Sequence, residues 1–132
     1  MITEDYVSFE TAKLLKEKGF DEEVTSFYLP NGTLSHGNTY AYCKMSVSSN
    51  SNFILAPTHQ MTMKWLREVH NIHIESFCPV VDTTDEPIKY NVVISDLRNH
   101  CLAFNTPLEN KEFDSYEQAC ETAIKYCLEY LI

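Results

Sequence analysis

The chain has 132 residues, of which 44% are hydrophobic and 12% aromatic, a composition that suits one folded domain and excludes a disordered chain. The formal net charge is -9, and no cluster of Lys and Arg offsets it. Because such a charge repels polyanions at long range, we expect no binding to duplex nucleic acid. No apolar run approaches the ~20 residues that a membrane span needs, so we expect no membrane partner.

The first helix is predicted over residues 9–18. Ser8 is a favourable N-cap, because its hydroxyl can accept a hydrogen bond from an amide of the first turn. Gly19 can adopt the left-handed conformation that ends a helix, and Phe20 follows where a Schellman motif places an apolar contact back to Leu15. These signals predict both ends of the helix.

Strand segments are predicted between the first and second helices. Residues 25–29 and 33–36 flank Pro30-Asn31-Gly32, whose proline presets φ and whose Asn-Gly pair accepts positive φ. This pattern predicts a β-hairpin. Residues 40–45 alternate as a further strand, and the Ser- and Asn-rich residues 46–52 are typical of a polar loop.

The second helix is predicted from Thr58, with Pro57 just outside it, to Asn71, which can take the left-handed conformation that ends a helix. On a helical wheel one apolar stripe faces the core, with Trp65 at its centre. The stripe comprises Met61, Thr62, Trp65, Leu66 and Val69, and the opposite side carries Gln60, Lys64 and Arg67. We therefore expect the only tryptophan of the chain to be buried against a sheet.

Further strands are predicted after the second helix. Residues 72–80 and 88–95 are predicted to form two strands, and the turn 96–99 leads to a third at 100–105. One face of the middle strand is predicted to carry Ile88, Tyr90, Val92 and Ile94.

The last helix begins at Ser115, which forms a capping box with Gln118. Its apolar face comprises Tyr116, Cys120, Ala123, Ile124, Cys127, Leu128 and Leu131. The resulting order is α-β-β-β-α-β-β-β-α. The sequence thus predicts a single α+β domain over residues 1–132, with a mainly antiparallel sheet and three helices packed on it.

The cysteines point to a reducing compartment. Five are present, an odd number with no C-x-x-C pair, and the N-terminal residues lack the basic and apolar regions of a secretion signal. We expect free thiols and a cytoplasmic protein. The many tyrosines and apolar side chains on the strands exceed what one small core needs, so we also expect a homo-oligomer.

Metal and cofactor sites are not predicted. His59 and His70 are separated along one helix by about 16 Å, too far to share an ion. His70, His73 and Glu75 lack a fourth ligand nearby. The stretch from His73 to Cys78 superficially matches a zinc deaminase motif, but its residue order is wrong.

Catalysis is not predicted either. Cys120 and Cys127 lie on the apolar face of a helix, and Cys101 and His100 are strand neighbours that point to opposite faces. The chain contains no glycine-rich phosphate loop and no nucleophile elbow. An enzyme would need an active site that the sequence does not disclose.

Recognition remains as the expected activity. Arg67 lies mid-helix on the face away from the predicted core, and its planar fork suits a phosphate. His70 lies one turn on, where the negative end of the helix dipole should favour its protonated form. Tyr40 and Tyr42 share one strand face and could stack on a base. These four residues form the predicted ligand-binding site.

Four short segments together carry a resemblance to a known family. They are Gly19-Phe20, Ala56-Pro57-Thr58, Trp65-Leu66-Arg67-Glu68-x-His70-x-Ile72-x-Ile74 and Phe113-x-Ser115-Tyr116-Glu117-x-Ala119. They resemble a family of small uncharacterised proteins encoded by gut Bacteroidales and by their phages and prophages, and the resemblance covers most of the chain.

This resemblance implies a genomic setting and no mechanism. Small acidic accessory proteins of phages often inhibit host defences, either by sequestering a nucleotide signal or by binding a host protein. The leading expectation is a non-catalytic, anti-defence protein that sequesters a small nucleotide-type signal. The alternatives are an inhibitor or adaptor that binds a host protein directly and, third, an enzyme with an unrecognised active site.

Overall fold

The computed structural model describes residues 1–36, 52–81 and 84–132. In these residues three α-helices and two three-stranded antiparallel sheets follow one another in the order α-β-β-β-α-β-β-β-α. The α+β class and the element order predicted from the sequence are confirmed, but the strands form two separate sheets. No helix in the described ranges is both long enough and apolar enough to span a membrane.

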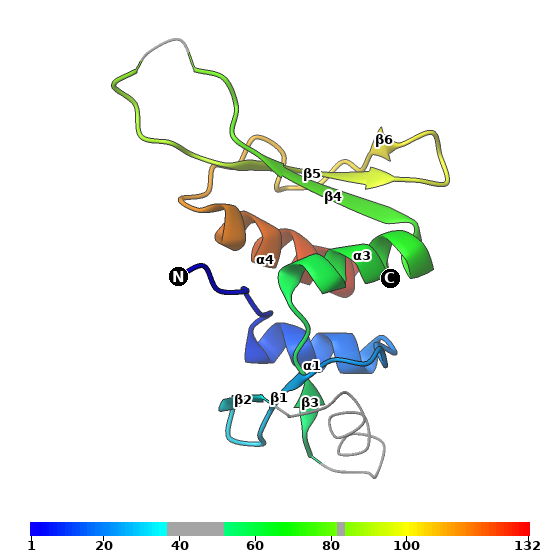
Figure 1. Ribbon diagram of the computed structural model, residues 1–132. Helices are drawn as coiled ribbons and strands as arrows, with labels where there is room; N and C mark the ends of the chain where they lie inside the picture. Colours follow the sequence, from blue (N-terminus) through cyan, green and yellow to red (C-terminus); the bar gives the residue numbers. More distant parts are fainter. Residues whose placement is uncertain (37–51, 82–83) are drawn as a thin grey trace.

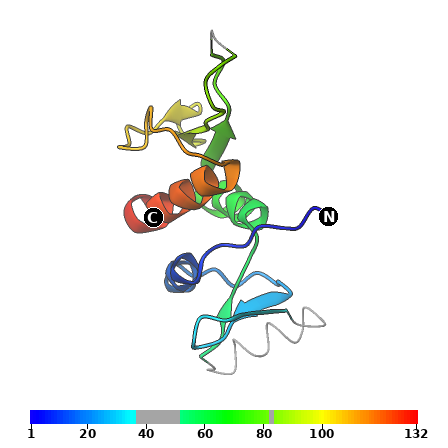
Figure 2. The ribbon, with the colours of Figure 1, turned by 90° about the vertical axis from the view of Figure 1, so that its left-hand side faces the viewer.

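The helices lie between the two sheets (Figures 1 and 2). The N-terminal part of the chain forms α1 (Phe9–Glu17), β1 (Ser26–Tyr28), β2 (Leu34–His36) and β3 (Ile54–Leu55). The part that follows forms α3 (His59–His70), β4 (Ile72–Phe77), β5 (Asn91–Asp96), β6 (Leu102–Ala103) and α4 (Tyr116–Tyr126). Helix α4 continues as the π-helical turn η1 (Cys127–Leu131). The strand orders are β2-β1-β3 and β4-β5-β6. Helices α3 and α4 pack beneath the second sheet, and α1 joins α4 to the first.

The first helix and the hairpin after it form as predicted. The Ser8 hydroxyl accepts a hydrogen bond from the amide of Thr11. Gly19 has φ +88°, and the amide of Phe20 donates to the carbonyl of Leu15 over 2.9 Å, as a Schellman motif requires. Gly32 has φ +86° in the β1–β2 turn. These local signals therefore determine this part of the chain.

The third described strand of the first sheet, β3, is a segment that the sequence did not predict as a strand. The predicted strand at 40–45 and the predicted loop at 46–52 fall almost entirely outside the described residues. In the described part of the chain β3 pairs with β1, with Phe27 opposite Leu55 and Tyr28 opposite Ile54. A strand of two residues is too short to show the alternation that reveals a strand in a sequence.

Helix α3 has the predicted ends but a rotated buried face. Thr58 is its N-cap, and Asn71 ends it in the left-handed conformation, with φ 58°. Trp65 is only 6% exposed, which confirms its predicted burial. Met61 and Val69 were expected in the core but are 38% and 51% exposed, whereas buried positions include His59, Thr62, Met63, Trp65 and Leu66. The helix contacts both β4 and α4, so its buried arc is centred on Leu66.

Strands β4 and β5 form a regular hairpin that runs from Ile72 opposite Asp96 to Phe77 opposite Asn91. The expected strand start at Ile88 is wrong, because β5 begins at Asn91 and Ile88 is 70% exposed. The turn after β5 is also longer than predicted. His100 and Cys101 both have positive φ, which confines β6 to two residues.

The last helix supplies most of the core beneath the second sheet. The Ser115 hydroxyl accepts from the amide of Gln118, and Gln118 Oε1 accepts in return from the amide of Asp114. The fully buried positions on its apolar side are Ala119, Cys120, Ala123, Ile124, Cys127 and Leu128. The cysteines that the structure describes are free thiols, and Cys43 lies outside the described residues.

Candidate functional site

The predicted site residues do not all come together. Arg67 and His70 lie on α3; His70 lines the groove described below, and the half-buried Arg67 is not among the lining residues of that groove. Tyr40 and Tyr42 lie outside the described residues, so the predicted stacking wall has no described geometry. The part of the predicted site that can be placed is therefore the C-terminal end of α3.

A groove of about 440 Å³ lies at this end of the helix. Its lining comprises His70, Ile72, Asp96, Arg98, Phe104, Leu131 and Ile132. One helix end and two backbone hydrogen bonds bring these residues together. Asn71 reverses the chain from α3 into β4, the amide of Leu97 donates to the carbonyl of Asn71 over 2.9 Å, and the amide of Phe104 donates to the carbonyl of Ile94 over 2.8 Å.

His70 is held in an unusual environment within the groove. Its ring packs edge-on against Trp65, with 4.6 Å between ring centroids. Its Nε2 atom is buried and has no hydrogen-bond partner among the described residues. Burial, followed by the positive charge of Arg98, lowers the pKa of His70 below its ordinary value of 6.5. The helix dipole was expected to favour the protonated form of His70, whereas burial and the charge of Arg98 act in the opposite direction and lower its pKa.

We expect acidification to destabilise the protein through His70. Because its pKa is lower in the folded chain than in the unfolded chain, the unfolded state binds the proton more readily. The contribution of His70 to the free energy of unfolding should therefore be fully present above about pH 6.5, and it should be lost as the pH falls toward the pKa of His70 in the folded chain. NMR titration of the ring should give a pKa below 6.5, and Arg98→Ala should raise it. A pKa above 6.5 would contradict this environment.

Of the residues that line the groove, the sequence predicted only His70 as a site residue, and Arg98 and Phe104 are among those that it missed. Arg98 is exposed and forms no ion pair with the residues that the structure describes. It is one of only two arginines in the chain and follows the predicted strand at 88–95 by three residues. The turn at 96–99 was predicted, but its return to the end of α3 depends on the pairing of β4 with β5, which is a tertiary feature.

A second polar cluster joins the three helices. Glu121 Oε1 accepts a hydrogen bond of 2.7 Å from the amide of Ser8, and its Oε2 accepts one of 2.7 Å from the hydroxyl of Thr11. His59 Nε2 lies 3.3 Å from Glu121 Oε1. Burial alone raises the pKa of Glu121, but the hydrogen bonds from His59, Thr11 and Ser8 outweigh it and bring the pKa below 4.5.

This cluster acts as a structural joint. Thr11 is fully buried and His59 is nearly so, and Ser8 already serves as the cap of α1. The hydroxyl of Thr11 donates to the carboxylate, but Thr11 is fully buried, so no substrate can reach it. His59 also lines a cavity of about 280 Å³ beside Gln60 and Tyr116. Glu121 fixes the ring of His59, and both residues hold α1, α3 and α4 together.

The buried thiols are poor candidates for chemistry. Burial raises the pKa of Cys120, and it raises the pKa of Cys127 to about 12. Thiolates are therefore strongly disfavoured at both positions, as expected for cysteines that pack in a core. Within residues 1–36, 52–81 and 84–132, no three His, Cys, Asp or Glu side chains are placed to hold a metal ion.

Comparison of the chain with protein-family models, with curated proteins and with solved structures finds no match. The functional assignment therefore depends on the groove and its chemistry.

Proposed function

We propose that the protein is a non-catalytic binding protein that holds a small, anionic, nucleotide-type ligand in the groove beside His70. The observation that carries this proposal is that Arg98, which forms no ion pair with the residues that the structure describes, and His70 line one groove of about 440 Å³. A volume of this size is typical of small-molecule sites. The groove also has apolar walls, as such sites usually do.

Each side of the groove has a role in this proposal. The guanidinium of Arg98 offers a planar pair of donors that fits a phosphate bidentately. Phe104, Ile72 and Leu131 offer an aromatic and aliphatic wall for a base. Asp96 lines the same groove and opposes an anion, so Arg98 has to dominate the local charge.

Sequestration is the biological role that we propose for this binding. The resemblance to proteins of gut Bacteroidales phages supports an anti-defence protein that removes a nucleotide signal from the host. The free thiols among the described cysteines support a cytoplasmic location.

The homo-oligomer expected from the sequence is also part of the proposal. Met61 and Val69, which are exposed on α3, offer an apolar contact, and Lys64 and Glu68 beside them carry opposite charges that suit a self-complementary interface. A protomer has a mass of 15.3 kDa, so light scattering on the samples used for binding measurements distinguishes a monomer from an oligomer.

Arg98→Ala should weaken nucleotide binding by at least about tenfold, or ~1.4 kcal/mol, with little change in melting because Arg98 is exposed. Calorimetry against a panel of cyclic and linear nucleotides measures this. Arg67→Ala is the matched control, since it removes the same side chain from outside the groove. It also tests the site predicted from the sequence, which assigns the phosphate to Arg67.

Binding should also depend on pH. A bound anion stabilises protonated His70, so affinity should increase as pH falls from about 7.5 to about 5.5, and His70→Asn should abolish that dependence. No heat with any nucleotide would refute the groove as a nucleotide site. A tenfold loss of nucleotide affinity in Arg67→Ala, with no loss of affinity in Arg98→Ala, would place the phosphate at Arg67 instead of in the groove.

Direct binding to a host protein is the second candidate. The observation that favours it is the cluster of exposed apolar residues on the connection between β4 and β5.

A further inference from the structure

The connection between β4 and β5 projects from the body of the protein. The described parts of this connection, residues 78–81 and 84–90, extend beyond the ends of both strands in two perpendicular views (Figures 1 and 2). We call these residues the arm. Because this connection projects, few of its side chains can be buried in the core of the protein.

The arm exposes apolar side chains where a surface loop is usually polar. Val80 is 99% exposed, and Val81 and Ile88 are also largely exposed. Phe77 is partly exposed where β4 enters the arm. Single exposed apolar residues are ordinary, but a group of them on one projection marks a surface that binds another molecule.

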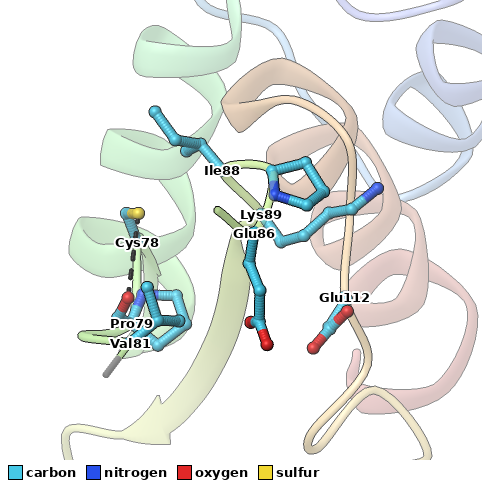
Figure 3. Close-up of a pocket in the computed structure, with 8 residues that line it drawn as sticks. Cys78, Pro79, Val81, Glu86, Ile88, Lys89 and Glu112 are labelled. Carbon is cyan, nitrogen blue, oxygen red and sulfur yellow. Dashed lines mark hydrogen bonds between the residues drawn. The ribbon is translucent and has the colours of Figure 1, made fainter. Parts of the chain in front are cut away.

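A pocket of about 300 Å³ lies at the base of the arm. Its lining comprises Cys78, Pro79, Val81, Glu86, Pro87, Ile88, Lys89 and Glu112. Figure 3 shows the carboxylates of Glu86 and Glu112 on the same side of the pocket, with Lys89 pointing away from them. Lys89 donates to Asp114, which offsets its positive charge. Neither Glu86 nor Glu112 forms an ion pair with a described residue.

We propose that this arm pocket binds a segment of a partner protein that presents an apolar side chain next to a Lys or Arg. The apolar lining takes the side chain, and Glu86 and Glu112 take the positive charge. The net charge of -9 attracts a basic partner at long range. A second copy of the chain is a poorer occupant, because it would bring the same carboxylates to the same place. This inference is independent of the groove beside His70.

The test uses the full chain, labelled with ¹⁵N, and two amidated pentapeptides. One has the sequence Gly-Lys-Leu-Arg-Gly and the other Gly-Glu-Leu-Asp-Gly. The basic peptide should shift the arm amides with a dissociation constant of about 1 mM or tighter, and the acidic peptide should bind at least about fivefold more weakly. Glu86→Lys should remove this preference. Glu109→Lys, the same change at an exposed position outside the pocket, should preserve it.

Other results would overturn the proposal. Equal binding of both peptides, shifts confined to residues outside the arm, or the same effect of Glu86→Lys and Glu109→Lys would each do so. An oligomer in sedimentation that Ile88→Ser dissociates would show that a second copy occupies the arm. Because Arg98→Ala leaves the arm unchanged, peptide binding by that variant separates failure here from failure of the nucleotide proposal.

Discussion

Replacing Trp65 with alanine is expected to lower the free energy of unfolding by about 3–5 kcal/mol. Trp65 is only 6% exposed. Its ring packs edge-on against Phe20, with 5.3 Å between centroids, and against His70. Removing it would leave a cavity between α3 and the chain that follows α1, and the neighbouring elements can close that cavity only in part. Denaturant unfolding followed by circular dichroism measures the effect, because the variant lacks the only tryptophan.

Val69→Ala is the control for this prediction. Val69 lies one turn after Trp65 on the stripe predicted to be buried, but the structure exposes it. Its replacement should change the stability of the monomer by less than about 0.5 kcal/mol, as is usual for a surface position, so the comparison is made at concentrations at which light scattering gives the protomer mass of 15.3 kDa. Comparable losses in the two variants would contradict the rotated buried face of α3.

Glu121→Gln is expected to cost about 2–4 kcal/mol near neutral pH, because charge-assisted hydrogen bonds from Ser8, Thr11 and His59 are all lost or weakened. The side-chain amide of the glutamine would also point its NH₂ donor at Ser8 N or the Thr11 hydroxyl, both of which are donors themselves. Glu117→Gln, on the same helix but exposed, should cost less than about 1 kcal/mol. Thermal or denaturant melts of both variants measure the difference.

The effect of Glu121→Gln should also depend on pH. The pKa of Glu121 is lowered in the folded chain, so its contribution is present above about pH 4.5 and is lost as pH falls through the folded pKa. The stability difference between the variant and the parent should therefore shrink at about pH 3. A difference that stays constant down to that pH would show that the carboxylate charge does not matter at this joint.

The ends of the helices could be predicted because they depend on neighbours in the sequence. Ser8, Thr58 and Ser115 cap the helices as expected, and Gly19 and Asn71 end two of them. Each of these effects involves residues within about four positions, so the sequence contains the whole cause.

The rotation of α3 and the division into two sheets could not be predicted. Which side of α3 is buried depends on the positions of β4 and α4, and a helical wheel cannot separate Met61 from Met63 when both are apolar. Pairing of strands into one sheet or two depends on contacts far apart in the sequence. The groove has the same origin, since Arg98 joins His70 only through the β4–β5 register.

The β4–β5 hairpin has its two ends at different surfaces. Ile72 and Asp96 stand at the groove, and Phe77 and Asn91 stand at the entrance to the arm. Six paired residues span about 17 Å, too far for one small ligand to touch both ends. A ternary complex of protein, nucleotide and peptide is therefore sterically allowed. Unless the hairpin bends, the two binding free energies should be additive, with a thermodynamic coupling near zero.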